Sequence, residues 1–86
     1  MQADQRTVLR LLKTARRQLD GIIKMVEEDR YCMDISQQVL AADAMLRRVN
    51  KEILTAHLKH CVEHARDERE RAEKIDELVA ALGKML

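Results

Sequence analysis

One uninterrupted segment, residues 32 to 64, constrains the fold of this chain more than any other feature. It contains neither proline nor glycine, the two residues that most often interrupt helices. Its apolar residues recur three and four positions apart, which is the spacing of an α-helix. They form two stripes, namely Ile35, Val39, Ala42, Leu46, Val49 and Ile53, and then Met33, Leu40, Leu54, Leu58 and Val62. We therefore expect one long helix that packs on two sides.

Two shorter helices are expected beside it. Amphipathic spacing runs from Thr7 to about Glu28 and breaks at "EEDRYC". Ile75, Leu78, Val79 and Leu82 predict a short third helix that ends near Gly83. The intervening "RDERERAEK" is expected to be a highly charged connection or a frayed turn. The sequence thus predicts an all-α protomer of three helices with a long second helix, in a single domain that spans residues 1–86.

The size of the chain predicts association. Eighty-six residues bury only a modest core, so a partner subunit would supply needed burial. The first helix can cover one stripe of the long helix, and the other stripe is expected to need a second protomer. We find no signal peptide, and no apolar run approaches the roughly 20 residues that cross a bilayer. We therefore expect a cytoplasmic oligomer with no membrane partner.

The formal net charge of +1 conceals an uneven distribution. Residues 6 to 24 hold six basic residues against a single acid, Asp20, and most of the bases fall in a stripe opposite the apolar face. The members of this stripe are Arg6, Arg10, Lys13, Arg17 and Lys24. Such a face suits a phosphate backbone, where each neutralised phosphate releases counterions. An ordinary solvated face is the alternative, although such faces usually mix both signs.

The segment "TAHLKHC", residues 55 to 61, contains side chains that bind metals. His57 and Cys61 are one helical turn apart and can grip one ion, but they supply only two ligands. Cys32 projects within about 40° of them around the helix axis, yet it lies roughly 37 Å before His57 along that axis. An antiparallel partner helix would bring its own Cys32 beside His57 and Cys61. Two-fold symmetry would then make two identical shared sites.

The types of ligand atom limit which metal ion the site could bind. Two thiolates and one imidazole suit Cu(I), and Zn(II) would need a fourth ligand such as water. The alternative is that both cysteines are small buried apolar residues, as free cysteines often are. His60 is expected to point toward the first apolar stripe, and His64 follows Cys61 by one turn. Either could be a packing residue or an auxiliary ligand, and we assign neither to the site.

With these residues placed, the sequence resembles the copper-sensing operon repressor family (CsoR). The resemblance rests on "LKTARRQLDGIIKMVEEDRYC", "ISQQVLAADAMLRRVNKEIL", "HLKHC" and "IDELV", which together span nearly the whole chain. It implies an antiparallel homodimer that pairs into a flat homotetramer. It also implies a repressor that binds double-stranded operator DNA when metal-free and releases it on binding Cu(I).

The resemblance also implies residue roles. The metal ligands would be Cys32, His57 and Cys61, and Tyr31 and Glu77 would couple the metal to DNA. Glu77 would accept the second ring N–H of His57, although it also fits an exposed acid on a charged helix. The DNA-binding positions map onto Lys13, Arg16 and Arg48, with Arg47 and Lys51 as neighbours. Two positions depart from the family pattern, because Leu11 replaces an arginine and Arg17 replaces a glycine.

Related sensors differ at these ligand positions. Within the wider group that the sequence resembles, nickel and cobalt sensors have a histidine where this chain has Cys61. Persulfide sensors lack the equivalent of His57, and formaldehyde sensors lack the second cysteine. The leading interpretation is therefore a Cu(I)-responsive repressor without catalytic activity, since no nucleophile and base arrangement is visible. Two alternatives are a persulfide or redox sensor that uses Cys32 and Cys61, and a helical scaffold or metal-buffering protein.

Overall fold

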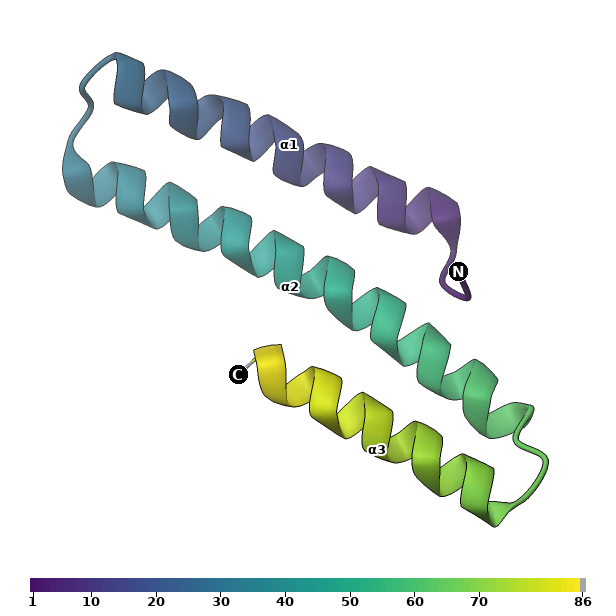
Figure 1. Ribbon diagram of the computed structural model, residues 1–86. Helices are drawn as coiled ribbons and strands as arrows, with labels where there is room; N and C mark the ends of the chain where they lie inside the picture. Colours follow the sequence, from purple (N-terminus) through teal and green to yellow (C-terminus); the bar gives the residue numbers. More distant parts are fainter. Residues whose placement is uncertain (86) are drawn as a thin grey trace.

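The computed structural model describes residues 1–85, which form three helices (Figure 1). These are α1 (Gln5–Glu27), α2 (Cys32–Glu63) and α3 (Glu68–Met85). The prediction of an all-α protomer with a long second helix is confirmed. No helix in the described part of the chain is both long enough and apolar enough to cross a membrane.

The helices lie side by side rather than around a central core. Figure 1 shows α1 and α3 running back along α2, one on each side of it, and within residues 1–85 only α2 contacts both of the others. The overall extents are 57 × 26 × 12 Å. Because a helix with its side chains is about 10–12 Å in diameter, the protomer is one helix thick.

A side-chain cap sets the start of α1, and a turn with one left-handed residue follows its end. The carboxylate of Asp4 accepts hydrogen bonds from the Thr7 backbone N–H (3.2 Å) and hydroxyl (2.6 Å), which caps the helix. The helix therefore begins at Gln5, two residues before the predicted start. The turn to α2 contains Asp29 in the left-handed region, with φ of 52°. Tyr31 is the N-terminal cap residue of α2, so the predicted break at "EEDRYC" is confirmed.

A small apolar core joins α1 to α2. Val8 and Leu11 are buried against Val49, and Met45 and Ile53 pack beside them. The first stripe of α2 is only partly covered by α1, because Ala42 and Val49 are buried whereas Val39 and Leu46 remain exposed. Much apolar surface of α2 thus has no partner within the protomer.

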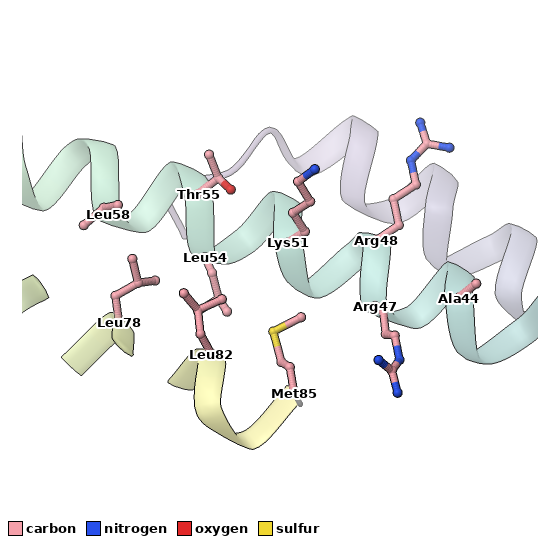
Figure 2. Close-up of a pocket in the computed structure, with 10 residues that line it drawn as sticks. All are labelled: Ala44, Arg47, Arg48, Lys51, Leu54, Thr55, Leu58, Leu78, Leu82 and Met85. Carbon is pink, nitrogen blue, oxygen red and sulfur yellow. The ribbon is translucent and has the colours of Figure 1, made fainter. Parts of the chain in front are cut away.

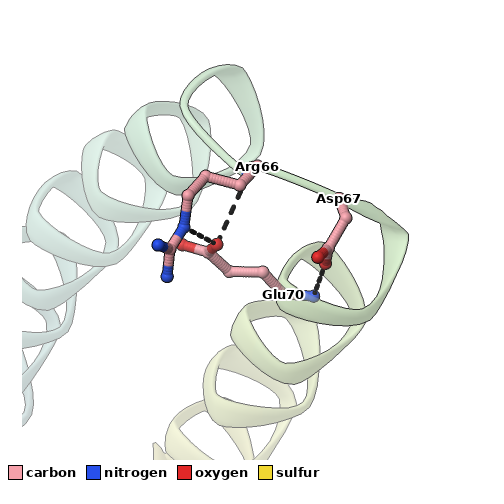
Figure 3. Close-up of polar contacts among 3 residues, drawn as sticks. All are labelled: Arg66, Asp67 and Glu70. Atoms are coloured by element: carbon pink, nitrogen blue, oxygen red, sulfur yellow. Dashed lines mark hydrogen bonds and ion pairs between the residues drawn. The ribbon is translucent and has the colours of Figure 1, made fainter.

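The predicted connection "RDERERAEK" is mostly helical, which corrects the expectation of a loop or frayed turn. The Asp67 carboxylate accepts a hydrogen bond from the Glu70 backbone N–H at 2.8 Å, and Arg66 pairs with the Glu70 carboxylate at 2.9 Å (Figure 3). Arg69 pairs with Glu73 at 3.3 Å, one turn further on. Pairs at this spacing favour helix, so α3 begins at Glu68.

The third helix ends two residues beyond Gly83, close to the predicted end. The helix continues to Met85, and a side chain at Gly83 would meet nothing within 4 Å. A single glycine costs a helix only ~1 kcal/mol relative to alanine. It therefore does not end a helix whose neighbouring residues favour continuation.

Part of the second stripe of α2 packs within the chain. Leu54 and Leu58 face Leu78 and Leu82 of α3 across a groove (Figure 2). The expectation that this whole stripe needs a second protomer is therefore wrong for its C-terminal half. At the other end of α2, Met33 and Leu40 are 57% and 65% exposed.

Candidate metal centre and DNA-binding face

His57 and Cys61 lie together on the C-terminal part of α2. The His57 Nε2 is 3.6 Å from the Cys61 Sγ, and the two residues are one helical turn apart. The His57 side chain is exposed, and Cys61 is half-buried. The pair is therefore accessible to an ion and already holds two donors in contact.

Glu77 of α3 lies beside the same histidine. Its Oε1 is 3.9 Å from the His57 Nε2, and its Oε2 is 3.7 Å from the Lys74 Nζ. A separation of 3.9 Å is too long for a hydrogen bond. It does place a carboxylate of α3 next to the imidazole of α2, so a small movement of α3 would make or break that contact.

Cys32 and Tyr31 lie at the opposite end of α2. Cys32 is the first residue of the helix and is exposed, and Tyr31 precedes it as the exposed cap residue. Within residues 1–85 no group of three histidine, cysteine or acidic side chains is placed to hold a metal ion. One protomer thus brings together two of the three predicted ligands and separates the third by nearly the full length of the helix.

His60 and His64 form a second pair that the sequence interpretation left without a role. Their rings stack with centroids 4.2 Å apart and an interplanar angle of 25°. The Nδ1 of His64 is 2.9 Å from the His60 backbone oxygen. The spacing of one helical turn in the sequence is the signal that could have predicted this pairing.

The predicted DNA-binding residues of α1 are exposed. Lys13 lines a shallow hollow with Arg6, Leu9, Arg10 and Arg17, and no acidic partner for Lys13 or Arg16 is found within 4.0 Å in the described residues. Leu11, which departs from the family pattern, is 2% exposed and belongs to the core. A charge at that position would be buried here, so the basic face does not include it.

The predicted basic residues of α2 line a groove between α2 and α3. The groove has a volume of about 690 Å³, with a leucine-rich floor and with Arg47, Arg48 and Lys51 among its lining residues. In Figure 2, Arg48 and Lys51 point to one side of α2 and Arg47 to the other. Arg47 is paired with Asp43 at 3.0 Å, whereas Arg48 has no acidic partner within 4.0 Å among the described residues. Arg48 is thus the better placed of the two to meet an anion.

Comparison with known proteins identifies the family. The family described as metal-sensitive transcriptional repressors matches residues 4–84. The chain is 42% identical over 78 residues to the copper-sensing transcriptional repressor CsoR of Mycobacterium ulcerans (strain Agy99), a match that covers 91% of this chain and 67% of that protein.

Two solved structures share the fold. The nickel-responsive transcriptional regulator InrS superposes with a TM-score of 0.81 at 29% identity, over 100% of this chain and 97% of InrS. The copper-sensing repressor CsoR with Cu(I) from Geobacillus thermodenitrificans NG80-2 gives 0.79 at 35% identity, over 92% of this chain and 82% of that one. The resemblance seen in the sequence motifs is confirmed, and the family is one of repressors rather than of enzymes. This chain belongs to the family of metal-sensitive transcriptional repressors.

Proposed function

We propose that this protein is a Cu(I)-responsive repressor that binds double-stranded operator DNA when metal-free and releases it on binding Cu(I). The ion would be held by Cys32 of one subunit together with His57 and Cys61 of another. The observation that carries the proposal is the placement of the donors: His57 and Cys61 touch at 3.6 Å, and Cys32 lies at the far end of the same helix. The site is therefore incomplete without a second chain.

An antiparallel homodimer would complete the site. Reversing one α2 against another places the partner subunit's Cys32 near the His57 and Cys61 pair, and two-fold symmetry repeats the arrangement at the other end. The exposed apolar residues Met33, Val39, Leu40 and Leu46 of α2 supply a surface for this contact. We further propose that two such dimers pair into a homotetramer and that the protein acts in the cytoplasm.

The donor chemistry favours Cu(I) over Ni(II). Two thiolates and one imidazole form a soft set of few ligands, which suits Cu(I), whereas nickel prefers more nitrogen and oxygen donors. A relative 42% identical and a solved structure 35% identical are named copper-sensing. The nickel-responsive InrS has a similar fold, so the choice of metal rests on the donors rather than on the fold.

The carboxylate of Glu77 is placed to orient the His57 ring. It lies 3.9 Å from Nε2, the nitrogen that is also 3.6 Å from the Cys61 Sγ, and a closer approach of α3 would let it accept the ring N–H that does not bind the ion. Glu77 belongs to α3, which also supplies one wall of the groove that Arg48 lines. Orientation of His57 by Glu77 would thus link the metal site to the position of α3. We propose that Tyr31, which precedes Cys32, also couples metal binding to DNA release.

DNA release is the direct test. Operator-bound protein is titrated anaerobically with Cu(I), and His57→Ala is titrated in parallel. We expect the parent to release DNA and His57→Ala to retain it, because two thiolates alone leave the coordination incomplete. If a polysulfide added to copper-free protein releases DNA from both proteins while Cu(I) releases it from neither, the chain is a sulfur sensor that uses Cys32 and Cys61.

Subunit mixing tests the shared site. Cys32→Ala and Cys61→Ala should each abolish Cu(I) binding when pure. Mixed dimers of the two variants should recover one site per dimer, because Cys32 from one chain still meets His57 and Cys61 of the other. A site built within one chain would not recover on mixing.

A further inference from the structure

We propose that His60 and His64 form a second metal site, separate from the proposed Cu(I) site, that takes a borderline divalent cation such as Cu(II), Ni(II) or Zn(II). Imidazole is the ligand these ions share, and a two-histidine site leaves positions for water. The two residues face each other across one turn at the end of α2, with ring centroids 4.2 Å apart. The inference does not depend on the proposed repressor mechanism.

The hydrogen bonding of His64 fixes the chemistry of its ring. The backbone oxygen of His60 can only accept, so the Nδ1 of His64 that lies 2.9 Å from it must carry the proton. In the neutral ring, Nε2 then carries the free lone pair. Histidines that bind metals commonly donate their other N–H to a backbone carbonyl in this way. The ring is therefore already in the tautomer that a metal ligand needs.

The local backbone holds this arrangement in place. His64 is the C-terminal cap residue of α2, and its backbone N–H also donates to the His60 oxygen, at 3.0 Å. That carbonyl belongs to the last turn of the helix, where acceptors lack partners within the helix. The His60 carbonyl therefore both caps the end of α2 and orients the His64 imidazole.

One rotation converts the stacked pair into a chelating pair. The ring centroids are 4.2 Å apart, so the two rings are neighbours, and we infer that a nitrogen of each can reach one ion held by bonds of about 2.0–2.1 Å. The rings are now nearly parallel, so the His60 ring must turn about its Cβ–Cγ bond to aim a nitrogen at the same point. That torsion is broad in histidine and turns at little cost.

The His57 and Cys61 pair and the His60 and His64 pair are separable by mutation. His57 contacts Cys61, and His60 contacts His64, so each member of one pair has its contact within that pair. Replacing Cys32 and Cys61 by serine removes the thiolates of the proposed Cu(I) site and leaves His60 and His64 intact. The double variant also lacks thiols that would reduce Cu(II), which makes Cu(II) a usable probe.

The experiment is a Cu(II) titration of the Cys32→Ser, Cys61→Ser protein followed by electron paramagnetic resonance. We expect one Cu(II) per chain with couplings from two imidazole nitrogens, and loss of that equivalent in both His60→Gln and His64→Ala. His57→Ala in the same background is the matched control and should keep it. Far-UV circular dichroism confirms that each variant is helical, and the exposed His64 gives the readout should His60→Gln unfold.

Three outcomes would overturn the site. The first is that the double serine variant binds no stoichiometric Cu(II). The second is that His64→Ala binds as well as its parent does. The third is that His57→Ala loses the ion, which would make His57 one of its ligands.

Discussion

At the scale of single residues, the carboxylate of Glu77 is the contact through which α3 meets the candidate metal centre. It lies 3.9 Å from the His57 Nε2 and 3.7 Å from the Lys74 Nζ. Both contacts are exposed, so neither contributes much to stability by itself. The importance of this carboxylate therefore lies in its position beside the His57 imidazole rather than in stabilising the fold.

We predict that Glu77→Gln keeps Cu(I) bound but weakens its ability to release DNA. The amide keeps the size of the side chain and loses the negative charge beside the His57 imidazole. Such substitutions also lower metal affinity by roughly 10 to 100-fold, so DNA affinity is compared at saturating Cu(I). Full release of DNA by the saturated variant would exclude a coupling role.

A second prediction concerns phosphate contacts. Lys13→Ala and Arg48→Ala should each weaken operator binding and reduce its dependence on salt, with a slope smaller by roughly one per lost phosphate contact. The measurement is operator affinity at several salt concentrations. Lys59→Ala, on the C-terminal part of α2, is the charge-matched control. Unchanged affinity and slope in both test variants would move the DNA surface elsewhere.

At the scale of elements, the carboxylates of Asp4 and Glu70 accept hydrogen bonds that stabilise the starts of α1 and α3. Hydrogen bonds from Thr7 lower the pKa of Asp4 below its ordinary value of 3.8. The hydrogen bond from Arg66 lowers the pKa of Glu70 below its ordinary value of 4.5. Because folding lowers both pKa values, the stabilisation is present above the ordinary values and is lost as pH falls through the lowered ones.

We therefore predict that acid frays these two helix starts. As pH falls below the ordinary pKa of both acids, the helix content of the parent should decline. The double variant Asp4→Asn, Glu70→Gln should begin from a lower helix content and show a smaller decline. The measurement is far-UV circular dichroism against pH. Glu63→Gln, for which no ion pair is found in residues 1–85, is the control. An acid response of the double variant identical to that of the parent would contradict the assignment.

The extent to which the sequence predicted the structure also depends on the element. The first two helices were predicted because apolar side chains recur at helical spacing over many turns. The start of α3 was missed because "RDERERAEK" has few apolar residues, and its helix is favoured by pairs such as Arg66 with Glu70. The contact of His57 with Cys61 followed from one-turn spacing. The third ligand lies outside a single chain, so the fold of one protomer does not test it.

At the scale of the whole molecule, the protomer is 12 Å thick and has no central interior. Its buried core is the narrow seam between α1 and α2, and much of α2 stays exposed, including Val39 and Leu46. A chain of this size buries too little apolar surface to be very stable alone. Association through these exposed residues would bury apolar surface that the single protomer leaves exposed.

We predict that the thermal stability depends on protein concentration. Association that favours the folded state raises the midpoint of unfolding as concentration rises. Thermal unfolding followed by circular dichroism over a wide concentration range measures this shift. Leu40→Lys should lower the midpoint at high concentration and remove most of the dependence, because it places a charge on the exposed stripe. A midpoint that is independent of concentration in the parent would argue for a stable monomer.

The unbroken length of α2 has a consequence for how this chain can vary. Cys32 begins the helix and Cys61 lies near its end, so the number of residues between them fixes both their separation and their relative angle. One inserted residue would turn Cys61 by about 100° relative to Cys32 and shift it by about 1.5 Å. Substitutions between the two cysteines leave that geometry intact, whereas a single insertion or deletion alters it. The geometry of the proposed site therefore fixes the length of α2 between the two cysteines, whereas the core and the proposed DNA-binding face constrain its composition.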